Sequence, residues 1–365
     1  GCSWISKSDT NPFSAIARDG GFTLVDHTDA DTSLFDQTGA RLGEDQVDIY
    51  EDTGDALGDA LEAAAEKGID APAIDHIPKG LPYAGAAQSW MGPMDFGVDF
   101  KDLSTQDYWN TTESQPSYIV REGLGAVVAT LAQDLPISLN TKVDHIDWSG
   151  PGVIVHTTNG TLRAKSCILT VSTGVLQSGS IRFTPALPDW KQQAFHDIPM
   201  GLLMKVPMLF DGARLDLPEN NWVTYDIPES DAGKACYFVA WPCGHDYLFG
   251  NIGGQFAWDL WSEGSDAVVD YALEQLVRIT GSNPRKHFVK GFATDWASNP
   301  LTHGAYGATR PGAFDAREKL AEPLADTLFF AGEAVMEDIS ALVNGAFVSG
   351  LETANDMAKC LKRQS

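Results

Sequence analysis

The chain has 365 residues, of which 43% are hydrophobic and 21% charged, and this length can form a large core divided between two domains. The formal net charge of −25 argues against nucleic-acid binding and mildly favours cationic ligands. No apolar run approaches the roughly 18 residues of a membrane-spanning helix, so we expect no membrane span.

The first half of the chain has the pattern of a helix followed by a strand–helix unit and further strands. Alanine and glutamate at helical spacing predict a surface helix over 55–66. An extended piece, a Gly turn and a helix follow over 116–135, and a strand over 137–149. Alternating apolar residues over 152–171 predict two strands joined by a turn at Asn159-Gly160, the second ending in an apolar run.

The second half has a different pattern. A short helix and a strand are expected over 187–210, and antiparallel strands rich in tryptophan and tyrosine over 222–256. Apolar residues at helical spacing predict a helix over 265–279. The segment 326–361 then has the pattern of a buried strand, a Gly turn, a loop and a long helix from about Leu342.

This closing segment predicts a nucleotide cofactor, because unpaired N–H groups and the helix dipole point into the gap between strand and helix. The strand stops at Ala331, Gly332 and Glu333. A Gly-x-Gly at Gly123 lacks the third glycine and the hydrophobic strand of a dinucleotide fingerprint. We interpret Gly123 as a helix start packed on a sheet and not as a phosphate loop.

The cysteines and histidines indicate neither a disulfide framework nor a metal centre. The five cysteines are odd in number and include no Cys-x-x-Cys pair, which predicts free or buried thiols. The eight histidines show no ligand spacing, so no metal site is expected. The cellular compartment stays open, with a lean to the cytoplasm.

Five segments in order resemble the signature segments of flavin-dependent amine oxidases, the monoamine and polyamine oxidases and their relatives. They are GCSWISKSDTNPF, LTVSTGVLQSGSIRFTPALP, IPMGLLMKVPMLFD, TDWASNPLTHGAYGATRPG and LFFAGEAVMEDISALVNGAFVSGLETA. The resemblance covers the chain from first to last residue, so it is far more specific than a single glycine motif.

The resemblance implies an α/β (α+β) fold with a Rossmann-like FAD-binding domain and a substrate-binding domain. The FAD-binding domain would comprise residues 1–15, 117–180 and 288–365. The substrate-binding domain, an antiparallel sheet flanked by helices, would comprise residues 16–116 and 181–287.

Family members carry a Gly-x-Gly-x-x-Gly turn ahead of the stretch that here is Gly1 to Ile5. The FAD diphosphate must lie on the helix after that turn. We therefore expect a second chain or an upstream segment to supply this unit, from a cleaved precursor or from sequence missing in an incomplete record. The absence of Met before Gly1 weakly favours processing or truncation.

The resemblance also implies three catalytic residues. Lys205 would hold a water molecule beside the reactive nitrogen of the flavin, and its apolar neighbours would lower its pKa. Trp296 would lie against the flavin, and Tyr306 would form one wall of an aromatic cage for a neutral amine. Gly304, Ala305 and Gly307 would let the backbone approach the ligand closely.

The cofactor contacts follow from the same matches. Gly332 and Glu333 would lie near the diphosphate and ribityl chain, and the N–H of Val343 would face the flavin pyrimidine. The backbone of Val143 would meet the adenine. The full expected set is Gly1, Cys2, Trp4, Val143, Trp296, Gly332, Glu333, Leu342 and Val343.

Two departures from monoamine oxidases bear on the chemistry. Ala305 stands where those enzymes carry the cysteine bonded to flavin, so the FAD should be non-covalent. Leu342 stands in place of the second cage tyrosine. A pocket of Tyr306 and Leu342 should accept an aliphatic di- or polyamine, with oxygen as the oxidant and hydrogen peroxide as product.

Two alternatives remain. An L-amino acid oxidase of the same fold would need an arginine clamp for the carboxylate, with Arg121 or Arg310 as candidates. A non-catalytic scaffold would keep the fold without the cofactor.

Overall fold

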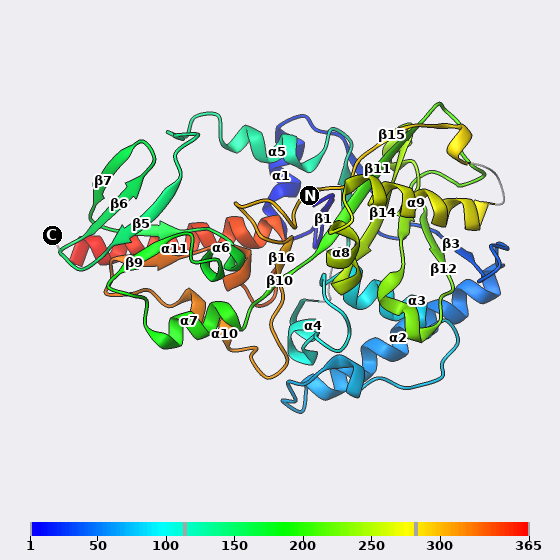
Figure 1. The fold of residues 1–365 in the computed structure, drawn as a ribbon, viewed down its shortest axis with the longest axis horizontal. Helices are drawn as coiled ribbons and strands as arrows, with labels where there is room; N and C mark the ends of the chain where they lie inside the picture. The colour runs from blue at the N-terminus through cyan, green and yellow to red at the C-terminus, as the bar shows by residue number, and fades with distance from the viewer. Residues whose placement is uncertain (1, 112–114, 281–283, 364–365) are drawn as a thin grey trace.

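The computed structural model describes residues 2–111, 115–280 and 284–363 and has two lobes along its long axis (Figure 1). The C-terminus lies at the outer end of one lobe, and the N-terminus lies between the two lobes. Among the described residues, no helix has both the length and the apolar character needed to cross a membrane.

A six-stranded sheet forms the centre of the larger lobe. Its order is β15-β11-β14-β13-β12-β3, and all neighbours are antiparallel except the parallel pair β12 and β3. The strands are β3 (Thr32–Phe35), β11 (Leu203–Phe210), β12 (Trp222–Tyr225), β13 (Tyr237–Val239), β14 (Tyr247–Gly253) and β15 (Phe288–Gly291). The antiparallel strands predicted over 222–256 are confirmed.

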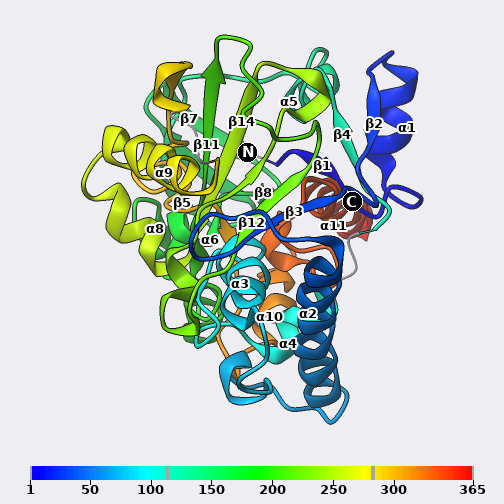
Figure 2. The same cartoon turned by 90° about the vertical axis from the view of Figure 1, so that its right-hand side faces the viewer.

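Two helices, α8 (Gly254–Trp261) and α9 (Ser265–Thr280), pack on this sheet (Figure 2). The predicted helix over 265–279 is confirmed as α9, because Val268, Ala272 and Leu276 at helical spacing are all completely buried. These side chains belong to the largest hydrophobic core of the protein.

Helices cover the lower end of the sheet in Figure 2. They are α2 (Glu44–Ala65), α3 (Ala84–Ser89), the π-helical turn η2 (Trp90–Met94) and α4 (Thr105–Thr111). The predicted surface helix over 55–66 was too short, since α2 begins eleven residues earlier at Glu44. Only its second half carries the completely buried Leu57 and Leu61, and the sequence signal came from there.

The smaller lobe contains two sheets. One has the order β7-β6-β5-β9, and the other is a parallel pair of β8 with β17. The strands are β5 (Val143–Asp147), β6 (Val153–Thr157), β7 (Gly160–Ala164), β8 (Cys167–Leu169), β9 (Arg182–Thr184) and β17 (Leu328–Phe330).

The hairpin of β6 and β7 is confirmed, but the expectation that its second strand continues into the apolar run was wrong. The ladder ends at Ala164, and residues 167–169 form β8, which pairs with β17. The reason is burial: Leu169 packs with Leu328 and Phe330 in the core of this lobe, whereas β7 is exposed along its whole length.

Helices surround these two sheets. They are α6 (Thr173–Gln177), α7 (Asp189–His196), α10 (Ala316–Ala321), the 3₁₀ turn η6 (Glu333–Val335) and α11 (Val343–Arg363). The expected order of strand, Gly turn, loop and long helix in 326–361 is confirmed. The division into two domains stays a prediction. The strand β9 and the helix α7, which were expected in the substrate-binding domain, pack in the same core as β8 and β17.

Short elements lie between the lobes. The strands β1 (Trp4–Ile5), β4 (Tyr118–Val120) and β2 (Leu24–Asp26) form one sheet, and β10 (Met200–Gly201) pairs with β16 (Tyr306–Gly307) (Figure 1). The helices α1 (Pro12–Asp19) and α5 (Leu124–Leu131) pack near them in a small core. As predicted, Gly123 stands at the N-terminus of a helix, α5, but the expected packing on a sheet was wrong, because a Cβ there would meet no atom within 4 Å.

Candidate functional site

Lys205 lies in the middle of the largest sheet with its ammonium group buried between aromatic rings. Its Nζ donates a hydrogen bond to Ser3 Oγ at 2.6 Å and lies 4.4 Å from the ring centre of Trp4 and 4.9 Å from that of Phe249. Burial lowers the pKa of Lys205 to about 8, and the nearby Cys2 opposes this effect. Lys205 therefore loses its proton more easily than an ordinary lysine.

Lys205 lies inside a strand and not at its end. The strand is interrupted at Leu202, so that β10 ends at Gly201 and β11 begins at Leu203. Lys205 is thus the third residue of β11, where both neighbouring side chains are completely buried.

Backbone hydrogen bonds hold the Trp296 loop beside Lys205. Thr294 N–H donates to the carbonyl of Lys205 at 3.0 Å, and Lys205 N–H donates to Thr294 Oγ1 at 2.9 Å. Two residues further on, the carbonyl of Trp296 accepts the N–H of Gly304 at 2.9 Å. The predicted residues Lys205 and Trp296 are therefore held in one framework that leads to Tyr306.

Tyr306 lies between the two lobes, in β16, and is paired with Gly201 of β10. Its hydroxyl donates to the carbonyl of Met94 at 3.3 Å. Burial raises the pKa of Tyr306 well above its usual value, and the nearby Asp95, Cys2 and Glu333 add to the effect. Gly201, the partner of Tyr306, lies four residues before Lys205 in the chain, so β16 pairs with the strand directly before that of Lys205.

Glycine is needed at the two positions beside Tyr306 for a different reason from the expected one. A Cβ at Gly304, which has φ of +142°, would lie 2.3 Å from Met200 Cβ, and one at Gly307 would lie 2.8 Å from Ile198 Cγ2. Both glycines therefore allow close packing against protein atoms, and not an approach to a ligand.

Gly332, in contrast, borders open space. It has φ of +136°, and a Cβ there would meet a single protein atom within 4 Å, the carbonyl oxygen of Thr170 at 3.9 Å. Its own N–H donates to Ser349 Oγ of α11 at 2.9 Å, which fixes the turn. Space beside a glycine turn between a strand and a helix fits the extended chain of a dinucleotide.

Glu333 is half-buried, and both of its carboxylate oxygens accept hydrogen bonds from backbone groups. Oε1 accepts the N–H of Gly307 at 3.0 Å, and Oε2 accepts the N–H of Ala341 at 3.0 Å. Burial raises the pKa of this carboxyl group, and the nearby Arg317 opposes the shift. Glu333 thus connects the Tyr306 strand to the segment that enters α11.

A buried ion pair supports this arrangement, and the sequence reasoning missed it. Arg317 donates to both carboxylate oxygens of Asp107, at 2.9 and 3.0 Å, and to the carbonyls of Ala334 and Gly307. Asp107 also accepts the N–H of Thr309 at 2.8 Å. The partners are 210 residues apart, and no local pattern could have paired them.

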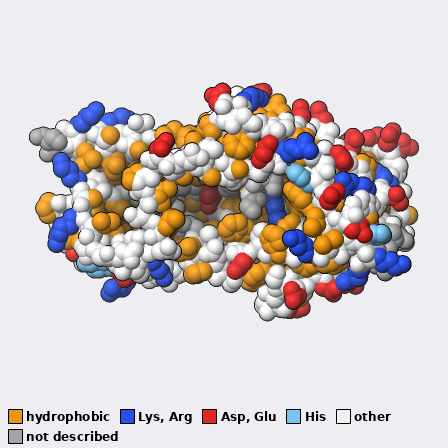
Figure 3. Space-filling view, turned by 90° about the horizontal axis from the view of Figure 1, so that it is seen from above, with side chains coloured by type: hydrophobic (Ala, Val, Ile, Leu, Met, Phe, Trp, Pro, Cys, Tyr) orange, Lys and Arg blue, Asp and Glu red, His pale blue; other side chains and the backbone are white. Residues whose placement is uncertain are grey.

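Asp95, at the end of η2, was also missed. It follows Met94, whose carbonyl accepts the Tyr306 hydroxyl, and its side chain is exposed. Burial nevertheless raises the pKa of Asp95 to about 7. Figure 3 shows a hollow in the middle of one face of the molecule.

The other expected cofactor residues lie on different elements. Val343 begins α11 and packs in the small core with Ile5 and Val120, and Leu342 precedes it, half-buried. Val143 lies in β5, in the outer sheet of the smaller lobe. Gly1 lies outside the described residues. The roles of all the site residues stay predictions.

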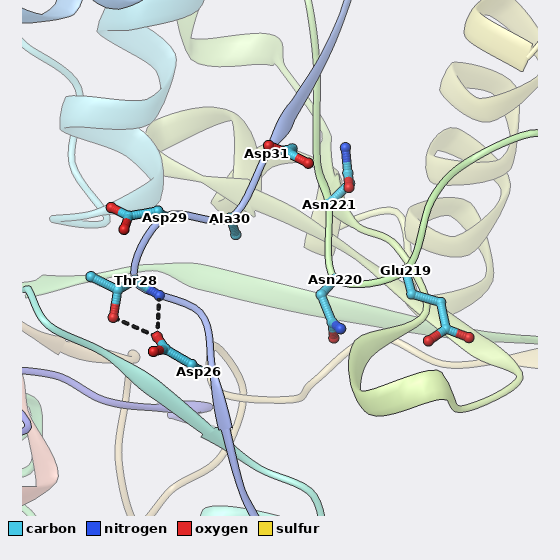
Figure 4. Close-up of a pocket in the computed structure, with 8 residues that line it drawn as sticks. All are labelled: Asp26, Thr28, Asp29, Ala30, Asp31, Glu219, Asn220 and Asn221. Carbon is cyan, nitrogen blue, oxygen red and sulfur yellow. Dashed lines mark hydrogen bonds between the residues drawn. The ribbon is translucent and has the colours of Figure 1, made fainter.

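A separate pocket of about 300 Å³ is lined by Asp26, Asp29, Asp31 and Glu219 (Figure 4). Its carboxylates point in different directions, and that of Asp26 accepts two hydrogen bonds from Thr28. Within residues 2–111, 115–280 and 284–363, no three His, Cys, Asp or Glu side chains could hold a metal ion together. This pocket is distinct from the Lys205 and Tyr306 site.

Comparison with known proteins identifies the family. Residues 97–358 match the model of the flavin containing amine oxidoreductases. Polyamine oxidase 4 of Oryza sativa subsp. japonica is 28% identical over 93% of this chain and 72% of its own length. Polyamine oxidase 2 of Arabidopsis thaliana is 32% identical over 72% of this chain and 53% of its own.

Solved structures confirm the predicted fold class. Putrescine oxidase bound to putrescine superposes with a TM-score of 0.80 at 16% sequence identity, over 98% of this chain and 88% of that one. The space beside Gly332 fits the FAD cofactor that the family uses. The chain therefore belongs to the family of flavin-containing amine oxidoreductases and is a flavin-dependent amine oxidase.

Proposed function

We propose that this enzyme oxidises an aliphatic di- or polyamine at the carbon beside a neutral amino group. The imine so formed is hydrolysed to an aldehyde and a free amine. When bound, FAD supplies the hydride acceptor and passes the two electrons to oxygen, which is released as hydrogen peroxide. The observation that carries the proposal is the buried Lys205, whose ammonium group lies between the rings of Trp4 and Phe249 and donates to Ser3.

Lys205 has the surroundings of a residue that positions water. A lysine ammonium has three donors, and Ser3 uses one of them, so two remain for a water molecule or substrate. The aromatic rings of Trp4 and Phe249 exclude other solvent from the group. We infer that Lys205 holds a water molecule close to the reacting carbon.

The substrate class rests on the pocket walls and on the relatives. Tyr306 offers one aromatic face, and Leu342 offers an aliphatic one, which suits a flexible alkyl chain better than a flat aryl ring. Ala305 offers no thiol for a bond to the flavin, so FAD is bound non-covalently. The names of the two plant relatives, both polyamine oxidases, support the same class.

An L-amino acid oxidase fits less well. A carboxylate clamp needs an arginine directed into the site, whereas Arg121 and Arg310 are both exposed. The buried Arg317 is already committed to Asp107. No specific contact therefore favours α-amino acids as substrates.

The test measures peroxide release from the flavin-loaded enzyme. It compares kcat/KM for putrescine and spermidine with kcat/KM for benzylamine, phenylethylamine and leucine. We expect the aliphatic amines to be preferred, and Leu342→Tyr to shift the preference toward aryl amines. Preference of the parent for aryl amines or for leucine would contradict the proposed substrate class.

We also propose that a further polypeptide segment with Gly-x-Gly-x-x-Gly completes the FAD site, either in a second chain or upstream. The pair of β8 and β17 is a very small sheet for a dinucleotide domain. On the same lobe Leu351 of α11 is 52% exposed and Leu139 is 78% exposed. Intact mass and N-terminal sequencing of the native flavoprotein test this, and a flavin-loaded species of this chain alone would contradict it.

A further inference from the structure

His27 is a buried histidine that the proposed mechanism does not use. It follows β2 and is 2% exposed, and its backbone N–H donates to the carbonyl of Ser117 at 3.0 Å. Burial lowers the pKa of its ring below the usual value, so the ring carries no charge near neutral pH. A neutral imidazole has one nitrogen that accepts a hydrogen bond and one that donates.

The accepting nitrogen holds the indole of Trp4. Trp4 Nε1 donates to His27 Nδ1 at 3.4 Å, and because an indole nitrogen can only donate, the lone pair lies on Nδ1 and the proton on Nε2. The ring of Trp4 also stacks on that of Trp222, with 5.2 Å between the ring centres and 23° between the planes. His27 meets Trp222 edge-on at 5.0 Å. The indole is therefore held at its N–H by His27 and across its ring by Trp222.

The same indole lies over Lys205. The Nζ of Lys205 is 4.4 Å from the centre of the Trp4 ring, which is the distance of a cation–π contact. Lys205 is 9% exposed, so little water can take the place of this ring. A rotation of the indole would move its face away from the ammonium group and would leave Ser3 and Phe249 as the contacts. The orientation of Trp4 thus determines the surroundings of Lys205.

The donating nitrogen of His27 makes a histidine at this position unfavourable for stability. Nε2 is buried and finds no hydrogen-bond partner in the described part of the chain. A buried donor without a partner lowers the free energy of unfolding, and an aliphatic side chain would pack against Trp4 and Trp222 without that loss. The aliphatic side chain would lack the Nδ1 acceptor, which points to the contact with Trp4 as the role of His27.

We propose that His27 is a positioning residue that holds the Trp4 indole over the ammonium group of Lys205. The inference rests on the proposed function for the task of Lys205, and it adds a residue that acts only through Trp4. No proton or electron passes along these contacts, because their effect is on orientation. Loss of the acceptor lets the indole turn, and the lysine that holds the water molecule then loses one of its walls.

The experiment measures kcat of the flavin-loaded parent, His27→Leu and His27→Asn with whichever amine of the panel above the parent oxidises fastest. His27→Leu removes the acceptor, and we expect kcat to fall about fivefold or more. His27→Asn places an amide oxygen near the position of Nδ1, so its kcat should stay within about twofold of the parent. His245→Leu is the matched control, because His245 is half-buried and also stacks on an aromatic ring, that of Tyr247. Its kcat should equal that of the parent.

Two further measurements separate the inference from a loss of folding and from failure of the proposed function. In a Trp4→Phe background, which has no indole N–H, His27→Leu should cause no further loss of kcat. In NMR spectra of the flavin-loaded protein with isotope-labelled tryptophan, the Nε1–H signal of Trp4 is assigned by its absence in Trp4→Phe. This signal should move upfield in His27→Leu and stay in place in His27→Asn.

The same loss of kcat from His27→Leu in the parent and in Trp4→Phe would overturn the inference, as would an indole signal that His27→Leu does not move. Full kcat in His27→Leu would overturn it as well when Lys205→Met is slow. If Lys205→Met turns over like the parent, the proposed role of Lys205 fails, and a moved indole signal still supports the positioning of Trp4 by His27.

Discussion

Replacing Arg317 by methionine would remove the cation of an ion pair whose two side chains are 1% and 0% exposed. Methionine keeps much of the volume but none of the donors. The change leaves Asp107 with its charge uncompensated and frees the carbonyls of Ala334 and Gly307. Loss of one partner from a buried ion pair costs about 3–5 kcal/mol of the free energy of unfolding.

The measurement is urea unfolding of the flavin-loaded protein, followed in parallel by far-UV circular dichroism and by flavin fluorescence. Arg310→Met, the same change at an exposed arginine, should stay within about 0.5 kcal/mol of the parent. Gly307 and Ala334 adjoin Tyr306 and Glu333. The Arg317→Met variant should therefore release its flavin at a lower urea concentration than the concentration at which it unfolds. A loss below about 1 kcal/mol would refute the reasoning, as would flavin release that coincides with unfolding in every variant.

Two further substitutions and one pH series test other parts of the structure. Lys205→Met should leave FAD bound and slow turnover at least 10-fold, about 1.4 kcal/mol of barrier; equal turnover would return Lys205 to a structural role. The pKa of Lys205 is about 8 in the folded protein and 10.5 in an ordinary lysine, so the unfolded chain binds more protons between pH 8 and 10.5. The free energy of unfolding of the parent, measured in urea relative to that of Lys205→Met, should therefore rise with pH across this window. Lys191, which is completely buried, donates to the carbonyls of residues 319, 320 and 322 at the end of α10. Lys191→Met should cost about 3 kcal/mol of unfolding free energy, with the exposed Lys319→Met as control, and a loss equal to that of the control would contradict this.

Local patterns were sufficient where a segment's own periodicity determines its structure. The helix α9 followed from its apolar spacing, and the closing strand, turn and helix from β17 to α11 followed from an apolar run and a glycine. The start of α2 did not, because the side chains before Thr53 are exposed or only half-buried. The end of β7 was missed because the partner of β8 lies about 160 residues away in the chain.

The candidate site was predictable only in part, because some of its contacts join residues that are distant in the sequence. The family motifs contain Lys205, Trp296 and Tyr306, and the structure holds these three in one hydrogen-bonded framework. The pairing of Arg317 with Asp107 depends on tertiary contacts between residues that carry no motif.

Glu333 has a consequence for the dimensions of the pocket. Its two oxygens hold the N–H of Gly307, next to Tyr306, and the N–H of Ala341, next to Leu342. In the pocket proposed above, the length of the Glu333 side chain therefore sets the distance between the Tyr306 wall and the Leu342 wall. Glu333→Asp, shorter by one C–C bond of about 1.5 Å, would narrow the slot and favour thinner substrates, whereas changes at Tyr306 or Leu342 alter only its chemistry. Redesign of the proposed pocket for bulkier amines therefore begins at Glu333, whose carboxylate is bound to two backbone N–H groups.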